Sequence, residues 1–219
     1  MRTFDVFLLA GTLVASCPGA VGVAGSGAKT LYENNFEKAA AGSVPDELLV
    51  LDGAFKVQQE GGNKFLELPG APLDTFGVLF GPTEKEGIAV SARVFGTGKG
   101  RRYPAFGVGL NGVGGFRLQV SPGKKTLEIL RGDTLKQSLP YEWTSGAWVQ
   151  LRLDLRKSKD GWRVSGKVWN AGQPEPATPT ISIEEREEPL AGRASIWGMP
   201  YSGTPIRFDD LAVMSSATD

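Results

Sequence analysis

Histidine is absent from this chain of 219 residues, and its single cysteine, Cys17, lies near the amino end. Catalytic sites that pair serine or cysteine with histidine are therefore excluded, as are zinc and iron sites with histidine ligands. A lone cysteine also cannot form a disulfide within the chain. Any chemistry or binding must come from other side chains.

Net charge is absent as well, because 24 basic residues balance 24 acidic ones. A neutral chain has no overall attraction for nucleic acid or for an anionic membrane. Hydrophobic residues make up 41% of the sequence, which is enough for a core and argues against extensive disorder. We therefore expect one folded domain.

One hydrophobic run, Val6 to Ala15, stands near the amino terminus. A run of about ten residues is typical of a signal-peptide core and is too short to span a bilayer, which needs about 20. We predict that residues 1–28 are a signal peptide and flexible leader, so that the protein is periplasmic, extracellular or lipid-anchored. Cleavage could follow Gly22 to Ala24, or Val14 to Cys17 could act as a bacterial lipobox with Cys17 lipidated. A buried N-terminal strand or helix is the remaining alternative.

Helical periodicity is scarce, and only Phe36 to Ala41 could form a short helix. Alternating segments instead recur about every ten to twelve residues between turn signals such as Asn111-Gly112 and Asp160-Gly161. This spacing predicts an all-β sandwich or barrel over residues 29–215, with a short tail at 216–219. The clearest predicted strands are Phe106 to Leu110, Phe116 to Val120, Val149 to Leu155 and Val164 to Val168, and Ile206 to Val213 is the last strand-like segment. Further candidates are Ala54 to Val57, Lys64 to Leu68, Gly77 to Phe80, Ile88 to Phe95, Leu127 to Arg131, Ile181 to Ile183 and Ala194 to Trp197.

Two adjacent carboxylates, Asp209 and Asp210, interrupt the last of these segments. Phe208 and Leu211 have opposite parity, so a β-bulge at the pair would return both side chains to the core. A bulge can also point both carboxylates to one side, where Ca²⁺ would bind with further oxygen ligands. In the alternative, one aspartate accepts backbone hydrogen bonds and the other faces water. If the first and last strands are neighbours, the predicted metal ligands are Glu33, Glu37, Asp209 and Asp210, with Asn35 as a further donor.

Four short motifs follow one another along the chain: Asn35 to Glu37, Gly146 to Leu151, Gly192 to Ile196 and Ile206 to Val213. Their order and spacing resemble the concanavalin A-like lectin/glucanase superfamily, particularly the laminin-G-like jelly rolls of secreted bacterial proteins. The resemblance covers about residues 30 to 215. It implies two antiparallel sheets packed face to face, with binding or catalysis on the concave sheet or its rim loops. It also implies that Trp148 packs in the core and that structural calcium occurs in some members.

The glucanase motif of this superfamily, Glu-x-Asp-x-x-Glu, does not occur in the sequence. Retaining enzymes hold two carboxylates about 5 to 5.5 Å apart, whereas Glu33 and Glu37 on one strand would be separated by roughly 13 Å. We therefore expect an exported, non-catalytic recognition domain that binds carbohydrate or another extracellular polymer. A glycoside-processing enzyme that uses Asp154, Asp209 or Asp210 with a glutamate is one alternative. A structural scaffold domain is another.

Sugar sites combine aromatic platforms with planar polar groups that read the hydroxyls. Four features fit this description: a basic loop that ends in an aromatic, a polar strand face, an outward tryptophan and an aromatic turn. Each has an ordinary alternative as a solvated loop, an outer sheet face or a packed corner. The predicted ligand-binding residues are Arg101, Arg102, Tyr103, Arg117, Gln119, Trp169, Trp197 and Tyr201.

Overall fold

The computed structural model describes residues 28–215, and every regular element in this range is a β-strand. The strands follow from the alternation of apolar and polar residues between glycine-containing turns. In chain order they are β1 (Thr30–Asn34), β2 (Leu49–Asp52), β3 (Lys56–Glu60), β4 (Asn63–Leu68), β5 (Phe76–Glu84), β6 (Ile88–Phe95), β7 (Ala105–Leu110), β8 (Phe116–Ser121), β9 (Thr126–Arg131), β10 (Thr134–Pro140), β11 (Trp148–Ser158), β12 (Gly161–Asn170), β13 (Ile181–Glu185), β14 (Gly192–Met199) and β15 (Ile206–Ser215).

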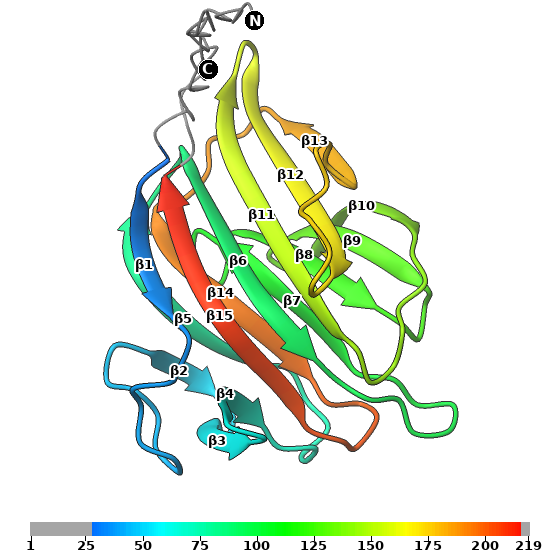
Figure 1. Ribbon diagram of the computed structural model, residues 1–219. Coiled ribbons are helices and arrows are strands. Elements are labelled where there is room, and N and C mark those ends of the chain that lie inside the picture. The colour runs from blue at the N-terminus through cyan, green and yellow to red at the C-terminus, as the bar shows by residue number, and fades with distance from the viewer. Residues whose placement is uncertain (1–27, 216–219) are drawn as a thin grey trace, which may run out of the picture.

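Two antiparallel sheets pack face to face (Figure 1). The eight-stranded sheet, nearer the viewer in Figure 1, has the order β13-β12-β11-β6-β15-β4-β3, and β1 pairs with the second half of β15. The seven-stranded sheet behind it has the order β10-β9-β8-β7-β14-β5-β2. This arrangement confirms the prediction of an all-β, antiparallel, two-sheet jelly roll.

The core lies between the sheets and is formed by one face of each central strand. Val108 on β7 pairs with Leu118 on β8 and Ile196 on β14, and all three side chains are fully buried. Val90 on β6 and Leu153 on β11 are an equivalent buried pair in the other sheet. Because successive side chains in a strand alternate, the residues between these positions lie on the two outer faces of the sandwich.

The predicted β-bulge in the last strand is present. The pairing of β15 with β6 shifts between Asp209 and Ala212, and Asp210 has a φ of 49°. As a result Phe208 and Leu211 both pack in the core, although their sequence parity differs. The predicted adjacency of the first and last strands is confirmed too, since β1 pairs with β15.

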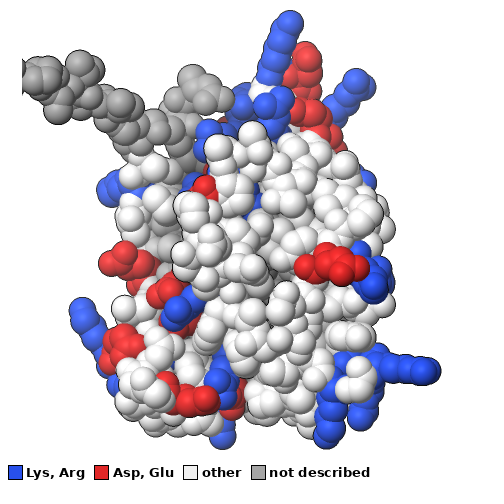
Figure 2. Space-filling model, turned by 45° about the vertical axis from the view of Figure 1, so that its right-hand side comes forward, with Lys and Arg blue, Asp and Glu red and all other residues white. Residues whose placement is uncertain are grey.

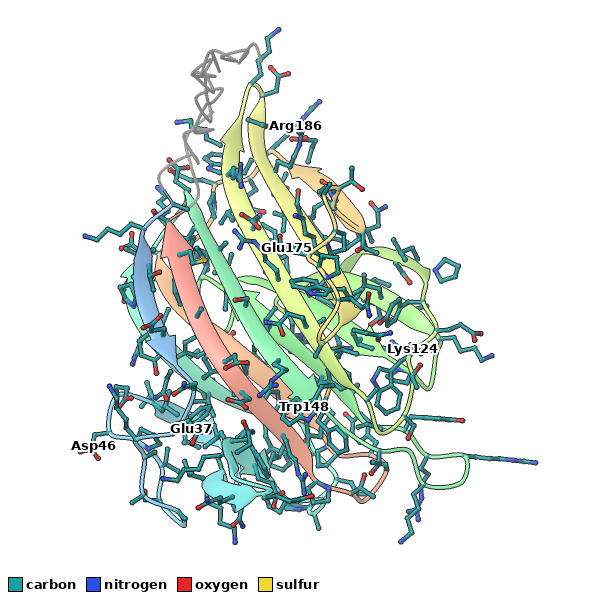
Figure 3. The ribbon with its side chains drawn as sticks, viewed as in Figure 1. Glu37, Asp46, Lys124, Trp148, Glu175 and Arg186 are labelled. Atoms are coloured by element: carbon teal, nitrogen blue, oxygen red, sulfur yellow. The ribbon has the colours of Figure 1, made fainter. Side chains whose placement is uncertain are left out.

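Three details differ from the sequence-based expectations. Residues 36–41 form turns rather than a helix, and Phe36 itself has a φ of 60°. Strands β2 and β10 carry no clear alternation in sequence and were not expected. Trp148 is not in the core; it lies on the outer face of the eight-stranded sheet (Figure 3), with its ring centroid 5.5 Å from that of Phe95 and Arg93 above it.

Both ends of the described segment leave the same end of the sandwich (Figure 1). The amide of Ser215 donates to the carbonyl of Lys29 over 2.8 Å. Within residues 28–215, no helix has the length and hydrophobicity that crossing a membrane requires.

Candidate functional site

Polar side chains on the outer face of the seven-stranded sheet are shielded from solvent, which indicates that this face is recessed. Gln119 on β8 is 7% exposed and Glu128 on β9 is 2% exposed, although both point away from the core. Ala105, Trp197 and Met199 form a second hydrophobic cluster on this face, separate from the main core. Buried polar and aromatic groups on an outward face are the features expected of a ligand site.

Glycine residues on the strands next to β14 leave room for the Trp197 ring. Trp197 on β14 pairs with Gly77 on β5 and Gly107 on β7. A Cβ atom added to Gly77 would come within 2.9 Å of the indole Cζ3, and one added to Gly109 within 3.2 Å of Nε1. The indole Nε1 donates to the Oγ of Ser195 over 2.8 Å, which fixes the ring against the sheet.

Arg117 on β8 covers this tryptophan, and its guanidinium carbon lies 5.1 Å from the Trp197 ring centroid. Beside it is a pocket of about 440 Å³, which we call the Arg117 pocket. Tyr103, from the loop between β6 and β7, and Tyr201, from the turn after β14, line the same pocket. Its lining residues are Thr75, Tyr103, Pro104, Ala105, Arg117, Gln119, Ser121, Gly123, Lys124, Asp133, Met199 and Tyr201.

Two lining side chains carry buried polar atoms without a partner among residues 28–215. These atoms are Nε of Arg117, a donor, and Oε1 of Gln119, an acceptor. A buried polar atom without a hydrogen bond costs about 1–3 kcal/mol. Burial lowers the pKa of Arg117, and the charges of Asp133 and Glu128 oppose that shift. Arg117 and Gln119 thus each keep one buried hydrogen-bonding atom, a donor and an acceptor, unpaired beside the pocket.

The amide of Gln119 is held in place by a buried carboxylate. Its Nε2 donates to Oε2 of Glu128 over 3.2 Å, and Ser121 donates to the same oxygen over 2.9 Å. Thr126 and Lys124 bind the other oxygen over 2.9 and 3.2 Å. Burial alone would raise the pKa of Glu128, but the hydrogen bonds from Ser121, Thr126 and Lys124 outweigh it, so the pKa lies below its ordinary value. The Oε1 of Gln119 is thereby left pointing away from this network.

Four of the eight predicted ligand-binding residues line this one pocket: Tyr103, Arg117, Gln119 and Tyr201. Trp197 lies beneath Arg117 and is only 8% exposed, so it supports the pocket rather than lining it.

The other three predicted residues lie elsewhere. Arg101 and Arg102 are exposed at the tip of the loop between β6 and β7, where Lys99 and Arg102 form an isolated bridge. Trp169 on β12 pairs with Gln150 on the outer face of the opposite sheet. Only part of the predicted ligand-binding set therefore lies at the Arg117 pocket.

Sequence reasoning missed Lys124, Glu128 and Asp133 at this pocket. Lys124 lies in the turn after β8 and Asp133 in the turn after β9, where charged residues are ordinary surface features. The alternation of Thr126, Glu128 and Leu130 on β9 was the available signal that Glu128 faces away from the core, and the register with β8 then places it opposite Gln119.

The predicted metal ligands meet in part at the pairing of β1 with β15. Glu33, Asn35 and Asp210 line a second pocket of about 640 Å³ together with Glu47, which we call the β1–β15 pocket. Glu37 is not part of its lining; its Oε1 accepts a hydrogen bond from the amide of Lys64 over 2.9 Å. Residues 28–215 contain no group of three or more acidic, histidine or cysteine side chains that could hold a metal ion.

Arg93 forms ion pairs with both Asp209 and Asp210, but the two carboxylates differ in burial. Asp209 is 1% exposed, forms an ion pair with Arg93, and accepts from Asn63 over 2.9 Å and from the amide of Asp210 over 2.8 Å. Burial and the neighbouring Asp209 raise the pKa of Asp210, whose side chain is 47% exposed. Asp209 thus accepts one backbone hydrogen bond, whereas Asp210 is about half exposed and pairs with Arg93 over 3.2 Å. Calcium binding stays a prediction, as does lipidation of Cys17, which lies outside the described residues.

No protein-family model matches the sequence, and a search of curated proteins found no match. The structure is similar to a Bacillus subtilis protein of unknown function with a galectin-like fold, with a TM-score of 0.61, 14% identity, and coverage of 87% of this chain and 98% of that one. It is also similar to the carbohydrate-binding module CBM66 from Bacillus subtilis, with a TM-score of 0.54, 10% identity, and coverage of 77% and 96%.

A third similar structure is lectin I-B4 from Griffonia simplicifolia, with a TM-score of 0.55, 9% identity, and coverage of 83% of this chain and 98% of the lectin. At these identities the likeness concerns the fold alone. The chain therefore has a lectin-like β-sandwich fold, consistent with the concanavalin A-like architecture that the sequence motifs suggested.

Proposed function

We propose that this protein is an exported, non-catalytic carbohydrate-binding domain whose ligand occupies the Arg117 pocket. The observation that carries the proposal is the buried pair of unpartnered atoms, Nε of Arg117 and Oε1 of Gln119, on residues that line a pocket together with two tyrosines. Sugar hydroxyls both donate and accept hydrogen bonds, so one saccharide can satisfy both atoms. Tyrosine rings suit the apolar faces of sugar rings.

Two further points support this proposal. The similar structures include a carbohydrate-binding module and a lectin. The buried carboxylate at the pocket, Glu128, has a lowered pKa, whereas the general acid of a glycosidase needs a raised one. Within the concanavalin A-like fold, we assign the chain to the laminin-G-like jelly rolls on the order of its sequence motifs.

The test is a glycan array probed with the wild-type protein, followed by affinity measurements on the best-bound oligosaccharide. Arg117→Ala should weaken binding roughly 10- to 100-fold, because a hydrogen bond to a charged group contributes about 1.5–3 kcal/mol. Trp169→Ala is the matched control, since it removes a partly exposed aromatic side chain from the opposite sheet. Unchanged affinity in the Arg117 variant would contradict the assignment, as would a loss confined to the Trp169 variant.

A second candidate function rests on the β1–β15 pocket. Asp210 has a raised pKa and shares this pocket with Glu33 and Glu47. A carboxyl group with a raised pKa beside a second carboxylate is the arrangement of a glycosidase. Turnover of an oligosaccharide panel that is lost in Asp210→Asn would favour an enzyme over a binding domain.

A further inference from the structure

The outer face of the eight-stranded sheet carries a third recess, on the opposite side of the sandwich from the Arg117 pocket. It has a volume of about 590 Å³, and we call it the basic groove. Its floor consists of outward residues of β11 and β12, and one wall consists of Glu175, Ala177 and Pro179 from the loop after β12. Figure 3 shows Glu175 beside these strands.

Positive charge dominates this groove. Its lining includes two carboxylates, Asp154 and Glu175, and six cationic side chains: Arg152, Arg156, Lys157, Lys159, Arg163 and Lys167. Since the whole chain is neutral, this excess reflects a local concentration of cations. Figure 2 shows Lys and Arg gathered at the upper end of the molecule, with Asp and Glu among them.

The strand pairing sets like charges directly opposite one another. Arg156 pairs with Arg163, and Arg152 pairs with Lys167, across the β11–β12 ladder. Like charges at directly opposed positions destabilise a sheet. Asp154, Glu175 and, on β13, Glu184 offset part of this repulsion through ion pairs with these cations. A bound anionic group would add to that compensation.

The carboxylates of the groove are already engaged. Asp154 binds Arg152 over 2.7 Å and Arg156 over 3.3 Å, and Glu175 binds Lys167 over 2.7 Å. At the rim, Lys157 and Lys159 are exposed, and among residues 28–215 neither lies within ion-pair distance of a carboxylate, although the charge of Lys157 helps to lower the pKa of Glu188. The groove therefore has cationic groups available beyond those that its own carboxylates neutralise.

We propose that the basic groove binds an acidic polysaccharide through sulfate or carboxylate groups along its chain. Guanidinium groups form paired hydrogen bonds with such planar or tetrahedral anions, and lysines add charge. The groove lining contains no aromatic residue, whereas single-stranded nucleic acid sites use aromatic stacking. A recess bounded by a loop also admits a single polymer chain more readily than a flat membrane surface. This site is separate from the proposed saccharide site.

The test measures retention of the full chain on immobilised heparin, a sulfated probe, and on immobilised polygalacturonate, a carboxylated one. Lys157→Gln combined with Lys159→Gln should elute at lower salt, and the slope of log Kd against log salt should fall by about two. The matched control is Lys99→Gln with Arg101→Gln, which removes the same charge from the β6–β7 loop and should elute near the wild type. Circular dichroism verifies that both variants fold.

Retention on either probe with this pattern supports the proposal. Passage of the wild-type protein through both columns at low salt overturns it. An equal loss in the two double variants overturns it too, as does equal or tighter binding to phosphatidylserine vesicles or to single-stranded DNA. Arg117→Ala should leave retention unchanged, so this outcome is independent of the saccharide proposal.

Discussion

The indole of Trp197 lies so close to Gly77 that a Cβ atom on the glycine would come within 2.9 Å of Cζ3 and 3.0 Å of Cε3. Gly77 has no positive φ, so its side chain is excluded by this contact rather than by the backbone. Because Gly77 has no side chain, the Trp197 ring can lie close to the sheet beneath Arg117.

Gly77→Ala should tilt the ring and disturb Arg117. Overpacking of this kind costs about 1–3 kcal/mol, which corresponds to a fall in Tm of roughly 2–10 °C for a chain of this size. Thermal unfolding followed by circular dichroism measures the change. Gly114→Ala is the control, because its added Cβ would meet only Cδ1 of Leu190 at an ordinary 3.4 Å. Equal melting temperatures for the two variants would show that the ring tolerates a side chain there.

Glu128 should make stability depend on pH in the acid range. Its pKa in the folded state lies below the ordinary value, which is about 4.3 for an unfolded chain. The carboxylate therefore stabilises the fold above that value, and the contribution is lost as the pH falls through the folded-state pKa.

Denaturant unfolding between pH 7 and pH 3 tests this dependence. Glu128→Gln should be less stable than the wild type by about 1–3 kcal/mol at neutral pH, and the difference should shrink in acid. Glu142→Gln, which alters a side chain that is 83% exposed, should follow the wild type at every pH. A constant difference between Glu128→Gln and the wild type across this range would contradict the role given to the buried carboxylate.

The two adjacent aspartates should respond in opposite directions to the same substitution. Asp209→Asn removes the charge that holds Arg93 and should cost about 2 kcal/mol, or roughly 4–8 °C in Tm. Asp210→Asn removes a carboxylate that burial and Asp209 disfavour, and asparagine tolerates its positive φ. We expect its Tm at neutral pH to equal or exceed that of the wild type. A larger loss in Asp210→Asn than in Asp209→Asn would reverse this assignment.

Calcium at this bulge would require Asp209 to exchange Arg93 for the ion. The predicted calcium site entails a Tm that falls with EDTA and recovers with millimolar Ca²⁺. A bound ion at a concentration of 100 times its Kd would add about 2.7 kcal/mol, so a site would be visible in thermal unfolding. A Tm that neither EDTA nor Ca²⁺ changes would contradict the sequence-based calcium site.

The fold could be predicted because most strands bury one face, which imprints a period of two on the sequence. The parity slip between Phe208 and Leu211 located the bulge for the same reason. The edge strand β10 escaped prediction because almost all its side chains are exposed. Trp148 was expected in the core because of the family resemblance. Strand parity gives the correct side, since Trp148 immediately precedes the inward-facing Val149 and therefore faces outward.

The candidate site was less predictable, because it depends on register between strands far apart in sequence. Arg117 and Gln119 were identified from one strand, but only the pairing of β8 with β7 and β9 shows that they meet Glu128 and the Trp197 floor. The basic groove has a similar origin. The alternation of Arg152, Asp154 and Arg156 is visible in sequence, but its partners Lys167, Ser165 and Arg163 are specified by the hairpin register.

The pairing of Thr30 with Met214 and the contact between Lys29 and Ser215 leave the start and end of the sandwich side by side. A host protein could therefore carry residues 29–215 as an insertion in one of its surface loops, with both junctions at a single point. The same proximity permits circular permutation: a short linker would close the old ends, and new ends could be opened at the turn between β11 and β12 without removing any strand from either sheet.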